Sequence, residues 1–424
     1  MQLRSRPIPG HKQMTALLAL SMALAALGID LMLPAFGLIR EDFGMASDST
    51  AVAGLVTAYF LGLAGGQLFY GPVSDRYGRK PTLYVGYAVY GIGALAAALA
   101  PSFVLLLIAR FVWGLGAAGP RVVTQAVIRD TYEGDAMARA LSMVMAVFVL
   151  VPIFAPTLGD LVSSATSWRW LFVGCFAAVV GMSFWALRLP ETLKPEHRME
   201  LRFGRIAAAS RVVVSNRQTL AYTLSMTALY GAFTSFIGSS EAIIGETFGQ
   251  ADRFPIIFGG IGCVIGSAML VNARIVSHFG ARRVVHSTFF AYMVVGAVFV
   301  VVALATDGRP PLWAFLLIMA CLVSGHALLI PNCNSIAMVP MGAVAGTAAS
   351  IMGAAQIAGG ALLGSITDQA FDGTVRPMAY GFLGYGVLAF LLMLWGEQGR
   401  LFDRTRVVAV QEDEVEDPAF QTVT

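Results

Sequence analysis

Charge is scarce in this chain of 424 residues. Asp, Glu, Lys and Arg together make up 12% of it, and hydrophobic residues make up 57%. A soluble chain is about a quarter charged. Here the mean hydropathy is +0.73, and the charges fall in short clusters between apolar runs of roughly 20 residues, the length that crosses a bilayer. The composition excludes a soluble domain and predicts an all-α membrane protein with many transmembrane helices.

Cysteine is also scarce, and other chemical signatures are missing. The four cysteines lie in apolar segments without paired spacing, so neither a disulfide framework nor a metal site is expected. No Walker-type phosphate loop occurs, and no nucleophile, base and metal converge in the apolar segments, so an enzyme is not expected. The formal net charge of +3 reflects arginines that face anionic lipid, and it gives no reason to expect nucleic-acid binding. The cysteines are Cys175, Cys263, Cys321 and Cys333.

The apolar runs predict twelve transmembrane helices. The first keeps more than twenty apolar residues and contains Asp30 and Pro34, so it is expected to be a retained helix and not a cleaved signal peptide. Continuous runs of this length also exclude an outer-membrane barrel. The predicted spans are 14–36, 50–72, 82–100, 103–125, 140–164, 168–188, 219–241, 255–276, 284–305, 311–334, 345–368 and 377–396.

The positions of Lys and Arg predict the orientation, because short positive loops stay on the cytoplasmic side. Of the 28 Lys and Arg residues, two lie within the fourth span and most of the others fall on one side. Both termini are therefore expected in the cytoplasm, and the inner (cytoplasmic) membrane of the cell is the expected location. The outer loops carry only Arg40, Arg169, Arg253, Arg309 and Arg376.

The longest inner segment divides the spans six and six. This predicts an N-terminal bundle (1–188), a cytoplasmic linker (189–218), a C-terminal bundle (219–400) and a disordered tail (401–424). Within the linker, apolar and basic residues alternate weakly. A helix along the headgroups and a solvated basic loop are equally good interpretations of it.

The most informative segment is the short charged loop from Gly71 to Pro81, which reads Gly-Pro-Val-Ser-Asp-Arg-Tyr-Gly-Arg-Lys-Pro. Its acid can accept hydrogen bonds from a helix N-terminus, while its basic residues bind acidic groups or carbonyl ends. Such contacts would hold an outward-facing state. Topology alone would explain the basic residues, but it does not explain the glycines or the acid, so a conformational latch is favoured. The predicted latch residues are Gly71, Asp75, Arg76, Gly78, Arg79 and Lys80.

A weaker copy of this loop follows about 202 residues later. Ser277 to Arg283 keeps the aromatic residue, the glycine and the basic neighbourhood, but Ser277 stands in place of the acid. The copy indicates an internal repeat. The second loop is expected to contribute less to charge-dependent holding.

With these motifs the chain resembles a twelve-helix member of the major facilitator superfamily over nearly its whole length. Three further segments resemble the drug:proton antiporters, in particular the bicyclomycin-resistance (Bcr/CflA) type of multidrug exporter. In the last of them, Ala155 and Asp160 replace the glycines that the antiporter pattern prefers. The segments are Asp30-Leu31-Met32-Leu33-Pro34-Ala35, Arg110-Phe111-Val112-Trp113-Gly114-Leu115-Gly116 and Ala155-Pro156-Thr157-Leu158-Gly159.

Asp30 and Arg110 are the principal site candidates. A charge at the bilayer centre costs roughly 2.5–3.5 kcal/mol on insertion scales, so such residues seldom persist without a role. The two lie at similar depths and would share one cavity, where burial and a nearby guanidinium together set the proton affinity of the carboxyl group. The resemblance implies a role for Arg110 in proton handling. A static ion pair, hydrogen bonds to broken backbone near Pro34, or a packing role for Arg110 are the alternatives.

Pro152, Pro156 and Gly159 form the third candidate group. The prolines remove backbone hydrogen bonds and bend the helix, and the glycine permits close approach of a neighbour. The resemblance places this segment at the interface between the halves. Asp160 is expected to be solvated near the outer end.

Other polar or aromatic residues in the spans are weaker candidates for the substrate cavity. His326 is more often a packing residue in such a place than a proton carrier. Arg121 is expected to snorkel to the inner surface, and Glu241 and Asp368 to meet water at outer ends. The remaining cavity candidates are Tyr59, Gln67, Trp113, Phe233, Asn332 and Gln356.

The expected function is secondary transport: two bundles rock around a central site and export amphipathic compounds in exchange for protons. The partners are a small-molecule substrate, protons and the lipid bilayer. No cofactor beyond the proton gradient is expected, and the functional unit is expected to be a monomer. Transport of a single metabolite, such as an amino acid, a siderophore or a sugar, and a receptor or scaffold with a transporter fold are the alternatives.

Overall fold

The computed structural model describes residues 11–46, 48–194, 196, 198 and 203–401. Twelve helical segments in this part of the chain are long and apolar enough to cross a membrane, which confirms the predicted number. Several helices extend beyond the predicted apolar edges, because a helix continues past the hydrocarbon layer into the headgroups. Apart from Leu401, the predicted tail lies outside the described residues.

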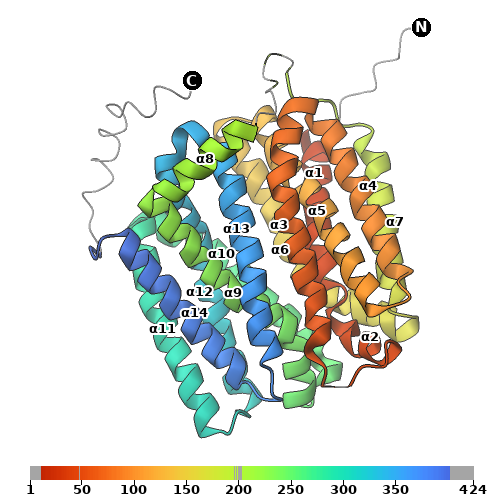
Figure 1. Ribbon diagram of the computed structural model, residues 1–424, viewed down its shortest axis with the longest axis vertical. Helices are drawn as coiled ribbons and strands as arrows, with labels where there is room; N and C mark the ends of the chain where they lie inside the picture. The colour runs from red at the N-terminus through yellow and green to blue at the C-terminus, as the bar shows by residue number, and fades with distance from the viewer. Residues whose placement is uncertain (1–10, 47, 195, 197, 199–202, 402–424) are drawn as a thin grey trace.

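The first half of the chain forms one group of packed helices, drawn from red to yellow-green in Figure 1. Its second and third long helices meet at Gly78, whose φ of 110° is open to glycine and strained for other residues. The elements are α1 (His11–Asp30), η1 (Leu33–Ala35), α2 (Phe36–Asp42), η2 (Thr50–Ala53), α3 (Gly54–Tyr77), α4 (Arg79–Ala98), α5 (Phe103–Thr131), α6 (Gly134–Ala165) and α7 (Arg169–Ala186).

The second half repeats the pattern, and α8 precedes it. The equivalent turn lies at Gly280, where φ is again positive, at 77°. The shared turn geometry fits the internal repeat seen in the sequence. The elements are α8 (Phe203–Ser215), α9 (Arg217–Ala242), η4 (Ile243–Thr247), η5 (Ala251–Arg253), α10 (Phe254–Phe279), α11 (Ala281–Ala305), α12 (Leu312–Met338), η6 (Val339–Val344), α13 (Ala345–Gln369) and α14 (Arg376–Gly396).

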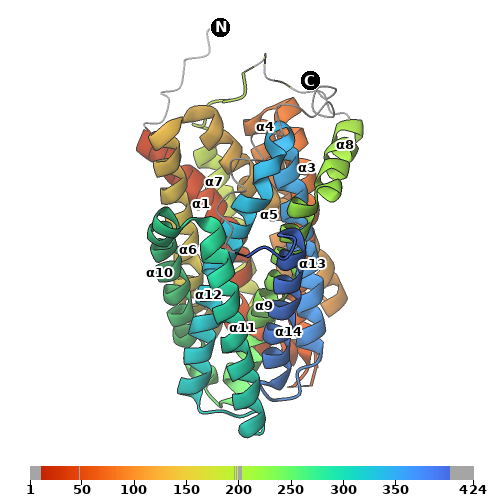
Figure 2. The same ribbon diagram turned by 90° about the vertical axis from the view of Figure 1, so that its left-hand side faces the viewer.

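The two halves meet along two helix pairs. α3 packs against α13 on one side of the molecule and α6 packs against α10 on the other, as the two views of Figures 1 and 2 show. α8 lies across one end of the bundle and contacts α9 and α13. The end that carries α8 is called the linker face below, and the opposite end is called the far face. The helical linker favours the first of the two interpretations of this segment.

Close helix packing within the first half depends on small residues. A Cβ atom on Gly114 of α5 would lie 1.9 Å from the backbone oxygen of Tyr59 on α3, and backbone cannot move aside as a flexible side chain can. Gly174 of α7, by contrast, has nothing within 4 Å of the same position. The two glycines therefore provide a matched test of packing.

We expect Gly114→Ala to lower the thermal stability of the protein, whereas Gly174→Ala leaves it unchanged or raises it slightly. Overpacking a tight contact costs about 1–3 kcal/mol, and replacing glycine by alanine in a helix is otherwise favourable. The measurement is the midpoint of thermal unfolding of each purified variant in detergent. Equal midpoints for the two variants would contradict the close packing of α3 and α5.

Candidate functional site

Asp30 is the last residue of α1, where the first span breaks before η1. Its side chain is 5% exposed. Among the described residues it has neither a hydrogen-bond partner nor an ion-pair partner. The break itself is held by backbone bonds, such as that from Leu31 N to Leu27 O (3.2 Å). Asp30 is thus a buried carboxyl group that makes no specific polar contact, which favours neither the static ion pair nor the hydrogen bonds to broken backbone.

Arg110 lies in the first third of α5 and is completely buried. Nη1 donates to Gly28 O at 2.7 Å, and Nε donates to Leu55 O at 3.3 Å. The guanidinium also lies 4.4 Å from the ring centre of Tyr59 and 4.8 Å from that of Trp113, so two rings add cation–π attraction. These contacts join α5 to α1 and α3. Arg110 therefore holds the backbone two residues before Asp30 and makes no ion pair with the carboxyl group.

Two of the predicted cavity residues are packed inside the first half. Tyr59 is 0% exposed and Trp113 is 1% exposed. The two rings meet edge-on with centres 6.1 Å apart, and Tyr59 Oη donates to Ala25 O at 2.9 Å. In this conformation neither ring lines a cavity. Sequence alone did not distinguish a lining aromatic residue from one that packs between helices.

The other predicted cavity residues divide between the interface and the second half. Gln67 is buried against Gly353 of α13, so it lies where the halves meet. Gln356 is half-buried on α13. Asn332 on α12 donates to Asn272 Oδ1 on α10 at 2.8 Å, a contact within the second half.

His326 is buried between backbone carbonyls of the second half. Nε2 lies 2.7 Å from Leu229 O and Nδ1 lies 3.1 Å from Leu322 O. The rings of Phe233 and Tyr292 lie 5.9 and 5.2 Å away. These surroundings suit a hydrogen-bonded packing residue.

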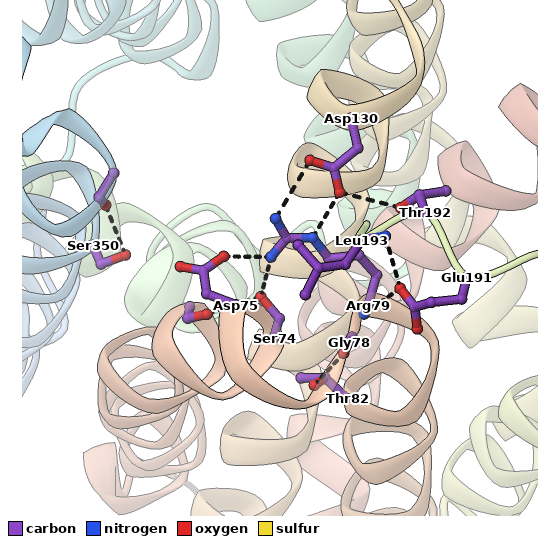
Figure 3. A network of polar contacts seen from close by, with 12 residues as sticks. Ser74, Asp75, Gly78, Arg79, Thr82, Asp130, Glu191, Thr192, Leu193 and Ser350 are labelled. Atoms are coloured by element: carbon purple, nitrogen blue, oxygen red, sulfur yellow. Dashed lines mark hydrogen bonds and ion pairs between the residues drawn. The ribbon is translucent and has the colours of Figure 1, made fainter. Parts of the chain in front are cut away.

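The Gly71–Pro81 loop forms a polar network at the linker face, shown in Figure 3. Arg79 Nη1 donates to Asp75 Oδ1 at 2.5 Å and to Ser74 Oγ at 2.8 Å. Its Nε donates to Asp130 Oδ2, at the end of α5, at 2.7 Å. Lys80 Nζ donates to Leu187 O at 3.0 Å, after α7. The loop therefore ties the linker-face ends of α3, α4, α5 and α7 together.

Two members of this network were missed by sequence reasoning. Glu191 accepts the backbone N–H groups of Arg79 (2.8 Å) and Lys80 (3.1 Å), and so caps the N-terminus of α4 from a distant segment. Asp130 is a second acidic partner of Arg79, beside Asp75. The sequence offered one sign of this pairing, because an acid directly follows Arg129 shortly after the fourth predicted span. Arg76 binds no acidic group among the described residues, and its guanidinium lies over the ring of its neighbour Tyr77.

Asp75 also faces the other half. It lines one small pocket together with Gly346, Thr347 and Ser350, in the first turns of α13. A Cβ atom on Gly71 would lie 3.3 Å from Ser350 Oγ, so the approach is close. The acid thus lies beside a helix N-terminus, where a negative charge is stabilised.

The copy of the loop has its own ion pair in the second half. Arg282 Nε lies 3.6 Å from Glu397 Oε1, and Tyr222 Oη donates to the same oxygen at 2.8 Å. Glu397 follows α14. The second loop is therefore anchored within its own half.

The proline and glycine group of α6 lies at two different contacts. Pro152 and Ile153 approach Gly262 of α10 across the interface between the halves. Gly159, however, packs within the first half, where a Cβ atom would lie 2.0 Å from Leu31 O and 3.2 Å from Pro34 Cγ. Pro156 is buried in the same turn, and Asp160 is exposed. Gly159 therefore packs directly against the break that follows Asp30.

A buried ion pair joins the halves at the far face. Arg40 of α2 donates from Nη2 to Glu241 Oε2 of α9 at 2.6 Å, and from Nη1 to Oε1 at 3.4 Å. Arg40 Nε also donates to Ser49 O at 3.1 Å. The side chains are 8% and 15% exposed. Both residues lie at the end of the molecule where they were expected, but Glu241 was expected to meet water there and is instead largely covered by its pairing with Arg40.

Asp368 was also expected in water, and this prediction was wrong. It is buried in α13, and Ser239 Oγ of α9 donates to Oδ1 at 2.5 Å. A Cβ atom on Gly238 would lie 2.4 Å from its other oxygen, so α9 packs directly on the carboxyl group. The length of the predicted span placed Asp368 near an outer end, but it could not show that α9 covers the carboxyl group there.

Comparison with known proteins places these features in a family. A family model described as Major Facilitator Superfamily matches residues 18–365. The chain belongs to the major facilitator superfamily. The superfamily consists of transporters, which confirms the expectation that the chain is not an enzyme. It is therefore a multi-pass membrane transporter of a small-molecule substrate.

Curated superfamily relatives are similar over most of their length. The chain is 28% identical over 363 residues to a "Bicyclomycin resistance protein homolog" of Haemophilus influenzae, covering 84% of this chain and 89% of the relative. It is 28% identical over 362 residues to "Multidrug resistance protein MdtL" of Klebsiella pneumoniae, covering 82% and 87%. It is 25% identical to "Multidrug resistance protein D" of Escherichia coli, covering 90% and 92%. These relatives confirm the resemblance drawn from the motifs.

Solved structures of the superfamily share the fold. The human organic anion transporter MFSD10 matches with a TM-score of 0.67 at 18% identity, covering 92% of this chain and 100% of that one. A D-xylose-proton symporter matches with a TM-score of 0.72 at 14% identity, covering 91% and 97%. The predicted twelve-helix architecture is confirmed.

Proposed function

We propose that this transporter exports amphipathic small molecules across the cytoplasmic membrane in exchange for protons, by alternating access to a site between its halves. Asp30 is the observation that carries the proposal. Its carboxyl group has no polar partner among the described residues, so it is available to bind a proton or a cationic group, and it cannot hold both at once. The names of the curated relatives, which refer to drug resistance, support drug-like substrates.

The contacts around Asp30 suggest how exchange would proceed. With the linker face open, the carboxylate releases its proton to the cytoplasm and takes the substrate. With the far face open, a proton from outside displaces the substrate. Arg110 acts as a positioning residue, because it holds Gly28 O while Gly159 packs on Leu31, on either side of Asp30. The linker face is assigned to the cytoplasm, because Lys and Arg concentrate there.

The test is accumulation of a panel of amphipathic compounds in everted vesicles that contain the full chain, with and without a proton uncoupler. The proposal expects several unrelated compounds to accumulate and the uncoupler to abolish accumulation. Counterflow of a single metabolite alone would favour a metabolite transporter. No counterflow of any compound from purified protein in liposomes would favour a receptor or scaffold, and either result contradicts the proposal.

We also propose that the Gly71–Pro81 loop is a latch that holds the linker face closed. Asp75 and Asp130 both bind Arg79. Among the described residues, Asp130 contacts only the first half and the linker, whereas Asp75 also faces the start of α13. Substitution of each acid in turn can therefore distinguish two roles of the loop: a latch between the halves, and structural support within the first half.

We expect Asp75→Asn to open the linker face and close the far face, whereas Asp130→Asn mainly lowers thermal stability. The measurement is labelling by an impermeant maleimide of Val52→Cys, in a background that lacks the four native cysteines. Val52 is buried in η2, which contacts α9 and α13 at the far face. Labelling should fall in Asp75→Asn and change little in Asp130→Asn. If both variants are folded and label to the same extent, the latch is contradicted, and the loop's basic residues serve only to keep it on the cytoplasmic side.

A further inference from the structure

Asp368 is a second buried carboxyl group without a cationic partner, and it belongs to the second half of the chain. It lies in the last turn of α13 and is 4% exposed. Ser239 Oγ of α9 donates to its Oδ1, and among the described residues the carboxyl group forms no ion pair. Both burial and the negative end of the helix dipole disfavour a negative charge there. Asp368 therefore holds a proton in this conformation.

The packing of α9 on the carboxyl group leaves room for a proton but not for a metal ion. A Cβ atom on Gly238 would lie 2.4 Å from Asp368 Oδ2, so the backbone of α9 covers this oxygen. A metal ion such as Ca²⁺ or Mg²⁺ needs about six oxygen ligands around it. A protonated carboxyl group instead needs one acceptor for its O–H. Ser235, one turn before Ser239, has a buried hydroxyl group without a hydrogen-bond partner among the described residues, so it is available as that acceptor.

Asp368 lies at the far face, close to the contacts that close this end of the molecule. The next residue, Gln369, is exposed. η2 of the first half contacts both α9 and α13. Glu241, three residues after Gly238 on α9, forms the buried ion pair with Arg40 of the first half. The first half therefore closes over the ends of the same two helices that enclose Asp368.

The other ionisable groups on the helices around Asp368 have partners of their own. Glu241 of α9 is paired with Arg40. On α14, Tyr385 Oη donates to a backbone oxygen of α13 at 2.6 Å, and Arg376 forms an exposed ion pair. η2 and the far-face turns of α3 and α12 carry no acidic or basic residue. Protonation of Glu241 would break its ion pair and favour opening, which is the opposite of the effect expected for Asp368.

We propose that Asp368 is a second proton-binding site, filled from the far face, and that its proton permits the far face to close. When η2 moves away, water reaches the end of α13, so the open conformation can hold the charged carboxylate that the closed conformation excludes. A proton from outside then favours closure. It returns to the same side when the far face reopens, so it is not carried across the membrane. This rests on the alternating access of the proposed function and adds a condition for one of its steps.

The test measures labelling of Val52→Cys by an impermeant maleimide in right-side-out vesicles, as the outside pH is lowered from about 8 to about 5. All proteins lack the four native cysteines and carry Asp30→Asn, so that a proton on Asp30 does not contribute. Each rate is divided by that of the denatured protein at the same pH, because a thiol reacts through its thiolate. One proton changes the ratio of the two conformations by up to about tenfold per pH unit. Relative labelling should therefore fall at least about tenfold over this range.

Asp368→Asn should label weakly at every pH, because asparagine is neutral like the protonated acid. Asp372→Asn is the matched control, since Asp372 is an exposed acid four residues later and its loss should leave the pH dependence intact. If Asp368→Asn does not fold, Ser239→Ala provides the second variant. It removes the hydrogen bond donated to the carboxyl group, which stabilises the charged form more than the neutral one, so closure should occur at higher pH.

Three outcomes would overturn the proposal: labelling that does not fall at low pH, the same fall in Asp368→Asn, or closure that requires Na⁺ and not protons. Labelling that rises at low pH would point to Glu241 instead. The export function is tested separately, by efflux from the protein with Asp30 intact. If that protein shows no proton-driven efflux while labelling still depends on Asp368 and pH, the export function is refuted and the proton site remains.

Discussion

Asp30→Asn should reduce proton-driven efflux to the rate of empty membranes while the protein stays folded. Asparagine has nearly the same shape as aspartate, but its amide group neither binds nor releases a proton at the pH values at which cells live. The Asp30 side chain has no polar partner among the described residues, so the substitution breaks no hydrogen bond or ion pair and should cost little stability. The measurement is efflux driven by a pH gradient in proteoliposomes, beside exchange of labelled for unlabelled substrate without a gradient.

The two assays separate coupling from movement of the protein. Exchange without a gradient should persist for substrates that do not need the negative charge, because the halves can still rearrange. Asp160→Asn is the control, since Asp160 is an exposed acid of the same half and should not affect efflux. Undiminished efflux in a folded Asp30→Asn protein would remove Asp30 from the coupling mechanism.

Sequence reasoning predicted the number of spans because length and hydropathy are local properties. It also identified the loop that begins at Gly71, since the motif is contiguous. It could not predict which distant ends meet. Arg40 and Glu241 are 201 residues apart in sequence, so nothing in the sequence near either residue shows that the two side chains pair across the halves. The same reason explains why the capping role of Glu191 was missed.

Helix length and side-chain direction were the other features that sequence reasoning could not settle. A single sequence does not show how far a helix continues beyond its apolar run, and α5 extends six residues past the predicted end. Nor does it show which way an aromatic residue points. Trp113 packs against Tyr90 and Phe172 within the first half, with ring centres 5.4 and 5.3 Å away.

The ion pair between Arg40 and Glu241 predicts the second large effect. Removing one partner of a buried pair costs about 3–5 kcal/mol, because the other charge stays buried and unpaired. That cost applies only to the conformation in which the pair forms. We therefore expect Glu241→Gln to shift the protein strongly toward the conformation with the far face open. Labelling of Val52→Cys from the outside should rise, and coupled transport should slow because one state becomes too stable.

A nearby pair provides the comparison that isolates this effect. Arg169 and Asp42 also form an ion pair at the far face, 2.5 Å apart, but within one half and with side chains 34% and 40% exposed. Exposed pairs contribute at most about 1 kcal/mol, so Asp42→Asn should barely change labelling. Exchanging the charges in Arg40→Glu with Glu241→Arg should restore part of the closed state, although the bond from Arg40 to Ser49 O is lost. If Glu241→Gln and Asp42→Asn label alike, the buried pair does not close the far face, and the packing of η2 on α9 and α13 must do so instead.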